Sequence, residues 1–215
     1  MVDARRAFLE AGHYDPLIRA IAARLDALGA DQRVFDAGCG EGAYLRRLAA
    51  LGAPLGRRMG LDISKVAVRL AAKADREGQY LVGSSFDLPL LDDSVDAVLR
   101  VFAPGDPAEA RRVLRPGGLY LVAAPGPRHL IELKQRIYDR PREHAPPRIE
   151  ADGFELLPVV NVDYRLRLDG PGEVANLLAM TPYYWSARPE VQESVRTVQS
   201  LDLTVSFQLH LLRRL

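Results

Sequence analysis

The alternation of short apolar runs with helical patterns over residues 30 to 125 is the feature that most limits the fold of this chain. Strands are predicted at "RVFDAG", "RRMGLDIS", "GQYLVGSS", "VDAVLRVFA" and, after an "RPGG" turn, "LYLVAAP". Helices are predicted between them, at roughly 44 to 51, in "SKVAVRLAAKAD" and in "DPAEARRVL". Strands and helices that alternate in this way build parallel sheets, so the sequence predicts an α/β fold with a doubly wound sheet.

The two flanks of this region differ from it in character. Residues 1–29 are predicted as an N-terminal helical segment, and 30–215 as the main domain. Within that domain, insertions are expected at about 126–150 and 165–200, where helical and Pro- and Arg-rich segments interrupt the strand pattern. The last predicted strand, Leu201 to Leu212, has no crossover helix after it. It is therefore expected to insert antiparallel beside the fifth strand.

Composition excludes several classes of protein. The 29 lysines and arginines nearly balance the 28 acids, so no global field attracts nucleic acid, and any such site must be a local patch. The single cysteine, Cys39, excludes an internal disulfide and a cysteine-cluster zinc site, and it is expected to pack under the neighbouring loop. No run approaches the roughly 18 apolar residues of a membrane span, and no signal-peptide core is present. A cytoplasmic location is expected.

A glycine-rich loop follows the first predicted strand. "DAGCGEG" brings Gly38, Gly40 and Gly42 close together, where a backbone without Cβ atoms can turn tightly and approach a ligand. The loop matches G-x-G-x-G, typical of S-adenosylmethionine sites, and with Ala43 also G-x-G-x-x-A, typical of dinucleotide sites. A turn with no ligand is the third alternative. Asp36, just ahead of the glycines, can cap the turn or accept an ammonium group.

The order of later elements separates these alternatives. Asp62 ends the second strand, where an acid accepts both ribose hydroxyls of an adenosine ligand of either kind. Next along the chain come "SSFDLPL" and "LRPGGLYLV". The last predicted strand follows them and has no helix after it. This order resembles class I S-adenosylmethionine-dependent methyltransferases, and implies a Rossmann-like, mostly parallel seven-stranded sheet with an antiparallel last strand. An NAD-dependent oxidoreductase would explain the loop and Asp62, but neither the Pro-Gly-Gly turn nor the last strand.

Further motifs resemble one branch of that class. "ARRAFLEAGHYDPL", "LDISKVAVRLAAK", "RVFAP", "PGPRHLIELKQRIYD" and "MTPYYWSARPE" together resemble the 23S ribosomal RNA (guanine-N1-)-methyltransferases. The resemblance implies methylation of N1 of a guanine in ribosomal RNA, with S-adenosyl-L-methionine as cofactor, and a homodimer. Two other functions stay open: a small-molecule methyltransferase on the same fold, and a non-catalytic cofactor-binding protein.

The resemblance also implies the residues of the cofactor site. Asp62 would hold the ribose, and the serines after the third strand would lie near the adenine. Tyr14 could instead cover a helix start, and His129 could cap its own helix. The cofactor contacts expected in this way are Tyr14, Asp36, Gly38, Gly40, Glu41, Asp62, Ser84, Ser85 and His129.

One part of the family pattern is missing. Members carry a cysteine-rich zinc module ahead of the stretch that corresponds to "ARRAFLEAGHY", and a chain with Cys39 alone cannot build such a module. No metal site is therefore expected. The chain would hold RNA with other surfaces, or would act on another substrate.

Two surfaces are candidates for holding RNA. A cluster of basic residues near the end of the fifth strand could contact phosphates, although it could equally be a solvated helix face. An aromatic turn, Tyr183 to Trp185, could stack an extruded base or pack a lid onto the core. The basic residues of the cluster are Arg128, Lys134, Arg136, Arg140, Arg142 and Arg148.

The expected reaction also needs a general base. Guanine N1 carries a proton at neutral pH, and that proton must leave before the nitrogen lone pair can attack. Asp106, which follows "RVFAPG", and His144, in the Pro- and Arg-rich connector, are the candidates. Asp106 could instead be the N-cap of a helix that begins at Pro107. Backbone carbonyls from Phe102 to Pro104 could orient the target base.

Overall fold

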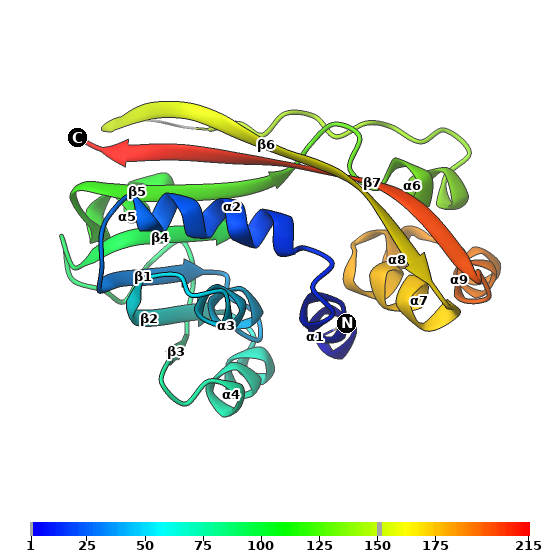
Figure 1. Cartoon of the computed structure of the whole chain (residues 1–215), viewed down its shortest axis with the longest axis horizontal. Coiled ribbons are helices and arrows are strands. Elements are labelled where there is room, and N and C mark those ends of the chain that lie inside the picture. Colours follow the sequence, from blue (N-terminus) through cyan, green and yellow to red (C-terminus); the bar gives the residue numbers. More distant parts are fainter. Residues whose placement is uncertain (1, 150–151) are drawn as a thin grey trace. The chain divides into compact units, whose positions relative to one another are not determined.

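The computed structural model describes residues 2–149 and 152–215, and its elements are labelled in Figure 1. The strands are β1 (Gln32–Ala37), β2 (Leu55–Asp62), β3 (Gln79–Val82), β4 (Val95–Val101), β5 (Leu114–Pro125), β6 (Phe154–Asp169) and β7 (Ser200–Arg214). The helices are α1 (Val2–Glu10), α2 (Asp15–Asp26), α3 (Ala43–Ala50), α4 (Lys65–Ala74), α5 (Pro107–Val113), α6 (Ile131–Ile137), α7 (Pro171–Met180), α8 (Tyr183–Ser186) and α9 (Pro189–Arg196). Position 150, at which a predicted insertion ends, lies outside the described residues.

The strands form one seven-stranded sheet in the order β3-β2-β1-β4-β5-β7-β6 (Figure 1). β1 pairs in parallel with β2 and with β4, and β4 pairs in parallel with β5. β7 is antiparallel to both β5 and β6. The predicted fold class, including the antiparallel last strand, is confirmed. The strand order reverses between β1 and β4, and in open α/β sheets a ligand binds beyond the carboxyl ends of the strands at such a point.

The Pro-Gly-Gly segment differs from its prediction. It was expected as a turn ahead of the fifth strand, but it lies within β5 as a bulge. Val95 of β4 pairs with Leu114, whereas Ala97, two residues later, pairs with Leu119. The extra residues of β5 loop out between these pairs, and Gly117 accommodates them with a φ of 78°.

The chain divides into two compact units. The first unit contains Met1–Asp15, Pro125–Pro146 and Asn161–Phe207, and the second contains Pro16–Ala124, Pro147–Val160 and Gln208–Leu215. None of the described helices is long and apolar enough to span a membrane.

The core of the second unit lies on its central strands. Phe35 of β1, Val98 of β4 and Val122 of β5 are buried in one cluster with Val113 of α5. β4 is buried at six of its seven positions, as expected of a strand that is covered on both faces. The packed sheet therefore holds the strand ends, and the loops that follow them, in fixed positions.

Aromatic residues form the core of the first unit. The ring of Tyr14 packs edge-on against Phe8 of α1 at 5.1 Å and against Phe207 of β7 at 4.8 Å between ring centroids. Leu177 of α7 is fully buried in the same unit, where α1 packs against α7. The residues of this core are far apart in sequence. Packing between them stabilises the short helices of the unit, because isolated helices of this length are not stable in water.

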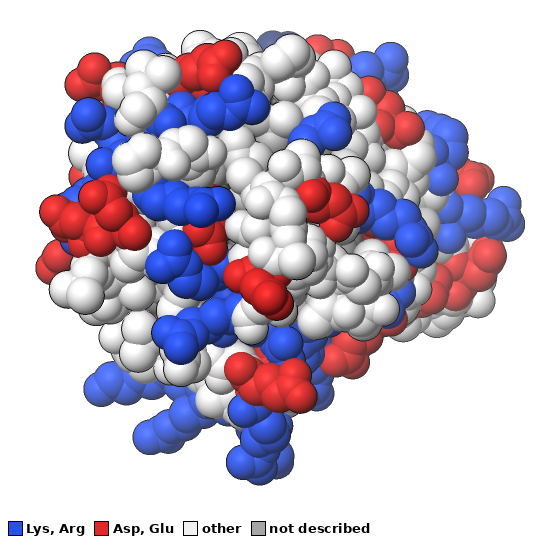
Figure 2. Space-filling view, turned by 60° about the vertical axis from the view of Figure 1, so that its left-hand side comes forward, with Lys and Arg blue, Asp and Glu red and all other residues white. Residues whose placement is uncertain are grey.

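Ion pairs join the elements of the second unit near its surface, and Figure 2 shows basic and acidic side chains next to one another on one face. Asp96, which is buried at the start of β4, pairs with Arg33 of β1 at 3.0 Å and with Arg115 of β5 at 2.7 Å. Its carboxylate also accepts a hydrogen bond from the backbone N–H of Arg33. The carboxylate thus bridges three adjacent strands, which is why its burial is tolerated.

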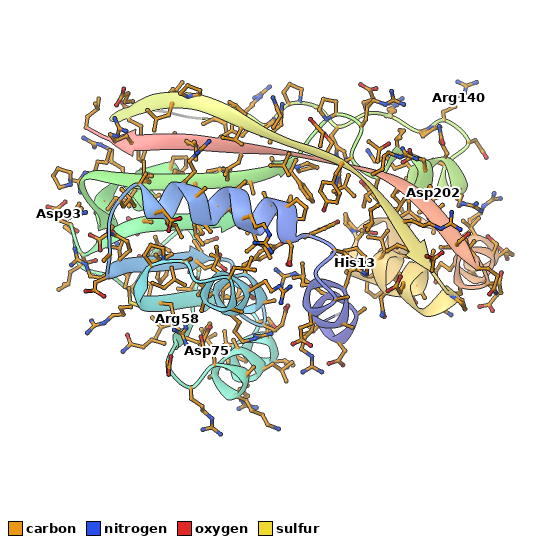
Figure 3. The ribbon with its side chains drawn as sticks, in the orientation of Figure 1. His13, Arg58, Asp75, Asp93, Arg140 and Asp202 are labelled. Carbon is orange, nitrogen blue, oxygen red and sulfur yellow. The ribbon has the colours of Figure 1, made fainter. Side chains whose placement is uncertain are left out.

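A second buried carboxylate fixes the end of α4. Asp75, the C-cap residue of α4, accepts two hydrogen bonds of 2.7 Å from Arg58 of β2 and one of 2.9 Å from the Tyr80 hydroxyl of β3 (Figure 3). Hydrogen bonding from Arg58 lowers the pKa of Asp75 to about 2, although burial acts in the opposite direction. The carboxylate therefore ties the helix to two strands as long as it is ionised.

Asp75→Asn is expected to destabilise the protein by about 2 kcal/mol at pH 7, because the depressed pKa measures how much the fold favours the charged form. This contribution is complete above the pKa of the unfolded state, near 4, and falls as pH drops towards 2. Urea unfolding of wild type and variant between pH 7 and pH 3 should show the difference shrinking below pH 4. The exposed Asp26→Asn serves as the control, and a difference independent of pH would contradict the assignment.

Candidate functional site

The glycine loop joins the carboxyl end of β1 to α3. Gly38, Gly40 and Gly42 have φ of 93°, 57° and 73°, in the left-handed region that favours glycine. A Cβ on Gly38 would lie 2.4 Å from the Cβ of Ala103, and one on Gly42 would lie 2.9 Å from the ring of Tyr80. The loop is thus held tightly between neighbouring segments, and its backbone follows a path that other residues could not take.

Asp62 connects this loop to α4. One carboxylate oxygen accepts a 2.9 Å hydrogen bond from the backbone N–H of Gly40, and the other accepts one of 2.8 Å from Ser64. The Ser64 hydroxyl in turn caps α4 by accepting from the backbone N–H of Ala67. The half-buried Asp62 therefore lies beside the loop at the strand ends, where the sequence predicted a ribose-binding acid.

Two further carboxylates lie in or next to the loop and are buried. Asp36, within β1, is fully buried, and Glu41 is 1% exposed. Neither would suit a loop that binds pyrophosphate, because two buried negative charges would repel the ligand. They are complementary to a ligand with an ammonium and a sulfonium group. This arrangement favours S-adenosylmethionine over a dinucleotide, the alternative that the loop sequence alone left open.

The predicted adenine-side serines join two loops. The Ser85 hydroxyl donates to the carbonyl of Pro104 at 2.9 Å, and the carbonyl of Ser85 accepts from the backbone N–H of Asp106 at 3.3 Å. The Ser84 hydroxyl accepts from the backbone N–H of Phe86 within its own turn. These bonds attach the loop after β3 to the loop after β4 and so shape the edge of the site.

Asp106 has a structural role. Its carboxylate accepts a 2.8 Å hydrogen bond from the backbone N–H of Ala108, as the N-cap of α5 with Pro107 in the first turn. The helix-cap interpretation of Asp106 is confirmed, and its catalytic role stays a prediction.

Exposed apolar side chains at the strand ends were not predicted as part of the site, although the backbone carbonyl of Phe102 was. Ile63, next to Asp62, is 80% exposed, and Phe86 after β3 is 58% exposed. Phe102, directly after β4, is exposed and has a φ of 54°, which costs energy for a residue with a Cβ. Apolar side chains beside ribose- and adenine-type contacts suit a flat base. In the sequence, the only signal for a role of these apolar residues is that they are neighbours of Asp62, of Ser85 and of the fourth predicted strand.

Tyr14 and His129, both predicted as cofactor contacts, are paired in the first unit. His129 is buried, with its Nε2 3.5 Å from the Tyr14 hydroxyl. Its Nδ1 accepts from the backbone N–H of Ser206, which places the proton of the neutral ring on Nε2. Burial lowers the pKa of His129 to about 3, so the ring is neutral at physiological pH. The pair presents polar groups without charge.

His144, the second candidate for the base, lies in the same unit. Its Nε2 is 2.9 Å from the Tyr183 hydroxyl, and burial, followed by the charge of Lys134, lowers its pKa. Lys134 is itself buried, with its ammonium group 2.9 Å from the carbonyl of Arg142, so it is not part of the exposed basic cluster. Of the aromatic turn, only Trp185 is largely exposed, at 73%. His144 is thus a neutral imidazole with an ordered partner.

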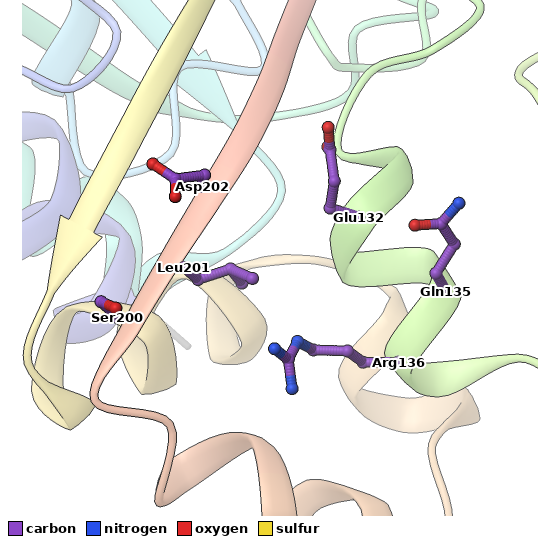
Figure 4. Close-up of a pocket in the computed structure, with 6 residues that line it drawn as sticks. All are labelled: Glu132, Gln135, Arg136, Ser200, Leu201 and Asp202. Atoms are coloured by element: carbon purple, nitrogen blue, oxygen red, sulfur yellow. The ribbon is translucent and has the colours of Figure 1, made fainter.

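A cavity of about 450 Å³ lies elsewhere in the first unit, between α6 and the start of β7 (Figure 4). Glu132 accepts a hydrogen bond from the backbone N–H of Thr204 and forms an ion pair with Arg165. The negative charge on this side of the cavity is therefore balanced within the protein. None of the predicted cofactor contacts or candidate bases lines the cavity, although Arg136 of the predicted basic cluster does. Its lining residues are Glu132, Gln135, Arg136, Ser200, Leu201 and Asp202.

The second unit thus fits an adenosyl cofactor with a cationic tail. Backbone N–H groups and an acid meet at the carboxyl ends of β1 and β2, exposed apolar side chains stand next to them, and buried carboxylates lie at the loop. No charged group of the kind that binds phosphate occurs among the predicted contacts there. The donor set agrees with S-adenosyl-L-methionine.

Comparisons with known proteins point to the same class. Residues 35–122 match the family model described as "Methyltransferase domain". The chain is 38% identical over 198 residues to a 23S rRNA (guanine(748)-N(1))-methyltransferase of Streptomyces fradiae, covering 88% of this chain and 70% of the relative. YxjB of Bacillus subtilis, provisionally named for the same methylation, is 32% identical, covering 93% and 74%. More distant relatives include methyltransferases named for small-molecule substrates.

Solved structures support the fold. YcgJ from Bacillus subtilis covers 91% of this chain and 98% of its own, with a TM-score of 0.53 and 14% sequence identity. The sequence relatives are similar enough, and covered far enough, to assign the family. The chain belongs to the 23S rRNA (guanine-N1-)-methyltransferase family of S-adenosyl-L-methionine-dependent methyltransferases.

Proposed function

We propose that the protein methylates N1 of a guanine in 23S ribosomal RNA. The similarity to the Streptomyces fradiae enzyme carries this proposal, because it extends over 88% of the chain, including the first unit, and so beyond the domain shared by all methyltransferases of the class. A cytoplasmic location, expected from the absence of apolar spans in the sequence, and a homodimer, implied by the resemblance, go with the proposal as predictions.

The chain's own residues would bind and orient the cofactor. The backbone of Gly38 and Gly40 would approach it closely, and Asp62 would accept hydrogen bonds from its ribose. The buried Asp36 and Glu41 would stabilise its positive charge. When bound, S-adenosyl-L-methionine supplies a methyl group on a sulfonium sulfur. Contacts from Ser84, Ser85, Tyr14 and His129 remain predictions from the resemblance.

The remaining chemical requirement is removal of the guanine N1 proton. The candidates for this role stay His144, which is neutral and can accept a proton, and Asp106, whose carboxylate also caps α5. In the reaction the N1–H bond breaks and the proton moves to the base. The freed N1 lone pair could then accept the methyl group that the bound cofactor would supply. The rest of the catalysis is positioning.

A small-molecule methyltransferase is the second candidate function. It is favoured by the near balance of acidic and basic residues and by the relatives that act on small molecules. It would use the same cofactor site, so only the substrate distinguishes it from the RNA enzyme.

The purified protein is expected to methylate unmodified 23S ribosomal RNA. Incubation with cofactor that carries a labelled methyl group should transfer label to the RNA, and primer extension should then stop at a guanine, because N1 methylation blocks Watson–Crick pairing. RNA incubated without cofactor is the control. Label transfer without a stop would contradict the N1 assignment, and no transfer to RNA would favour the small-molecule function.

Asp62→Ala is expected to weaken cofactor binding about 100-fold or more. The substitution removes a charged acceptor and releases the N–H of Gly40, and hydrogen bonds to charged groups contribute roughly 1.5–3 kcal/mol each. Calorimetric titration with S-adenosyl-L-methionine measures the effect, and Asp26→Ala on the exposed end of α2 is the matched control. Wild-type affinity in Asp62→Ala would show that the ribose assignment is wrong.

The two candidate bases can be separated with isosteric variants. His144→Gln is expected to lower kcat by roughly 10²–10⁴-fold without changing cofactor affinity. Because its pKa is lowered, the wild-type base should stay active below pH 6.5 and lose activity only in more acidic solution. Asp106→Asn keeps a good N-cap and should retain the wild-type rate. A loss of kcat in a stably folded Asp106→Asn would assign the base to Asp106 instead.

A further inference from the structure

One face of α4 carries an unbroken row of positive charge. Lys65, Arg69 and Lys73 follow one another at four-residue intervals and are all exposed. Residues four apart lie on the same side of a helix, about 6 Å from one another along the axis. Arg76, also exposed, follows just beyond the C-cap. We call Lys65, Arg69 and Lys73 the α4 row. Figure 2 shows basic side chains projecting into solvent at its lower edge, the level at which Figure 1 has α4.

The charges of this row lack a paired counter-charge in the part of the chain that the structure describes. Among the described residues, none forms an ion pair or hydrogen bond with a side chain of the row. Other basic residues of the second unit are paired: Arg33 with Asp96, Arg58 with Asp75 and Arg112 with Glu109. α4 itself contains no acid. The row is therefore open to an anionic partner.

The first cation of the row stands where the helix disfavours it. Lys65 is the first residue of α4, and the first turn of this helix contains no acid. A helix N-terminus carries a partial positive charge, so a lysine there is unfavourable in electrostatic terms. The stability of α4 therefore does not explain why Lys65 stands at this position, whereas contact with an anionic partner would explain it.

The row is rigid and close to the cofactor site. The opposite face of α4 is buried through Ala67, Val68 and Ala71, and Asp75 ties the end of the helix to two strands. Its first residue comes three positions after Asp62, whose carboxylate binds both the glycine loop and the residue that caps α4. A partner on the row would thus be held at a fixed position relative to the glycine loop.

We propose that the α4 row is a docking surface for the phosphate backbone of the RNA substrate. This inference rests on the proposed function. Phosphates along an RNA strand are evenly spaced negative charges at a separation comparable to that of the row, and such contacts fix position and register without reading sequence.

The test compares two triple variants with equal loss of charge. Lys65→Gln/Arg69→Gln/Lys73→Gln removes the row, and Arg19→Gln/Arg57→Gln/Arg111→Gln removes three exposed arginines elsewhere in the second unit. Binding of in vitro transcribed 23S ribosomal RNA is measured by filter retention over a range of salt concentrations. We expect the row variant to bind about tenfold more weakly at physiological salt and to lower the slope of log K against log salt by about two.

The outcomes are distinct. A lower slope in the row variant alone supports the docking surface. An equal change in both variants, or no change in either, overturns it, as does a wild-type protein that fails to bind RNA. Cofactor affinity of both variants should stay at the wild-type value. Failure of the proposed function appears separately, as the absence of a primer-extension stop with the wild-type protein, so the two results cannot be confused.

Discussion

The Asp62 carboxylate is the interaction on which the arrangement of the second unit's site depends. One of its oxygens accepts from the loop after β1 and the other from the turn that begins α4. A single acid thereby fixes the backbone that approaches a cofactor and the helix that follows it. For the proposed ribose contact, an acid engaged in this way is oriented before the ligand arrives, so binding requires little further ordering. The bond to Gly40 also holds the glycine loop in its left-handed backbone path.

Burial of charge then determines which ligand the loop accepts. Asp36 and Glu41 are both nearly inaccessible to solvent, and buried carboxylates need a cation or several donors nearby. In the proposed site a cationic cofactor would lie next to these two carboxylates, whereas a pyrophosphate would be repelled by them. The first unit differs, because its buried histidines carry no charge: His129 and His144 have lowered pKa values and stay neutral. The protein thus places two buried carboxyl groups at the loop and keeps His129 and His144 as neutral hydrogen-bonding groups.

Local patterns in the sequence predicted most of the fold, and long-range contacts account for what they missed. Strand and helix periodicity, the glycine spacing and the N-cap role of Asp106 depend on neighbours within a few residues, so they could be read directly. The contact of Tyr14 with His129 joins residues 115 positions apart, and that of His144 with Tyr183 joins residues 39 apart. The burial of Lys134 and the left-handed φ of Phe102 likewise arise from packing, which no local pattern encodes.

The near-neutral net charge conceals how the charges are distributed. A net charge of +1 argues against a nucleic acid partner only if no group of unpaired positive charges lies together on the surface. Many arginines of the second unit are instead bound by acids, as Arg33, Arg58 and Arg112 are, and contribute little field beyond their own pair. On α4, by contrast, Lys65, Arg69 and Lys73 stand in one row, and the helix itself contains no acid. What matters for a polyanionic substrate is therefore the set of unpaired charges on a rigid element and not the sum over the chain.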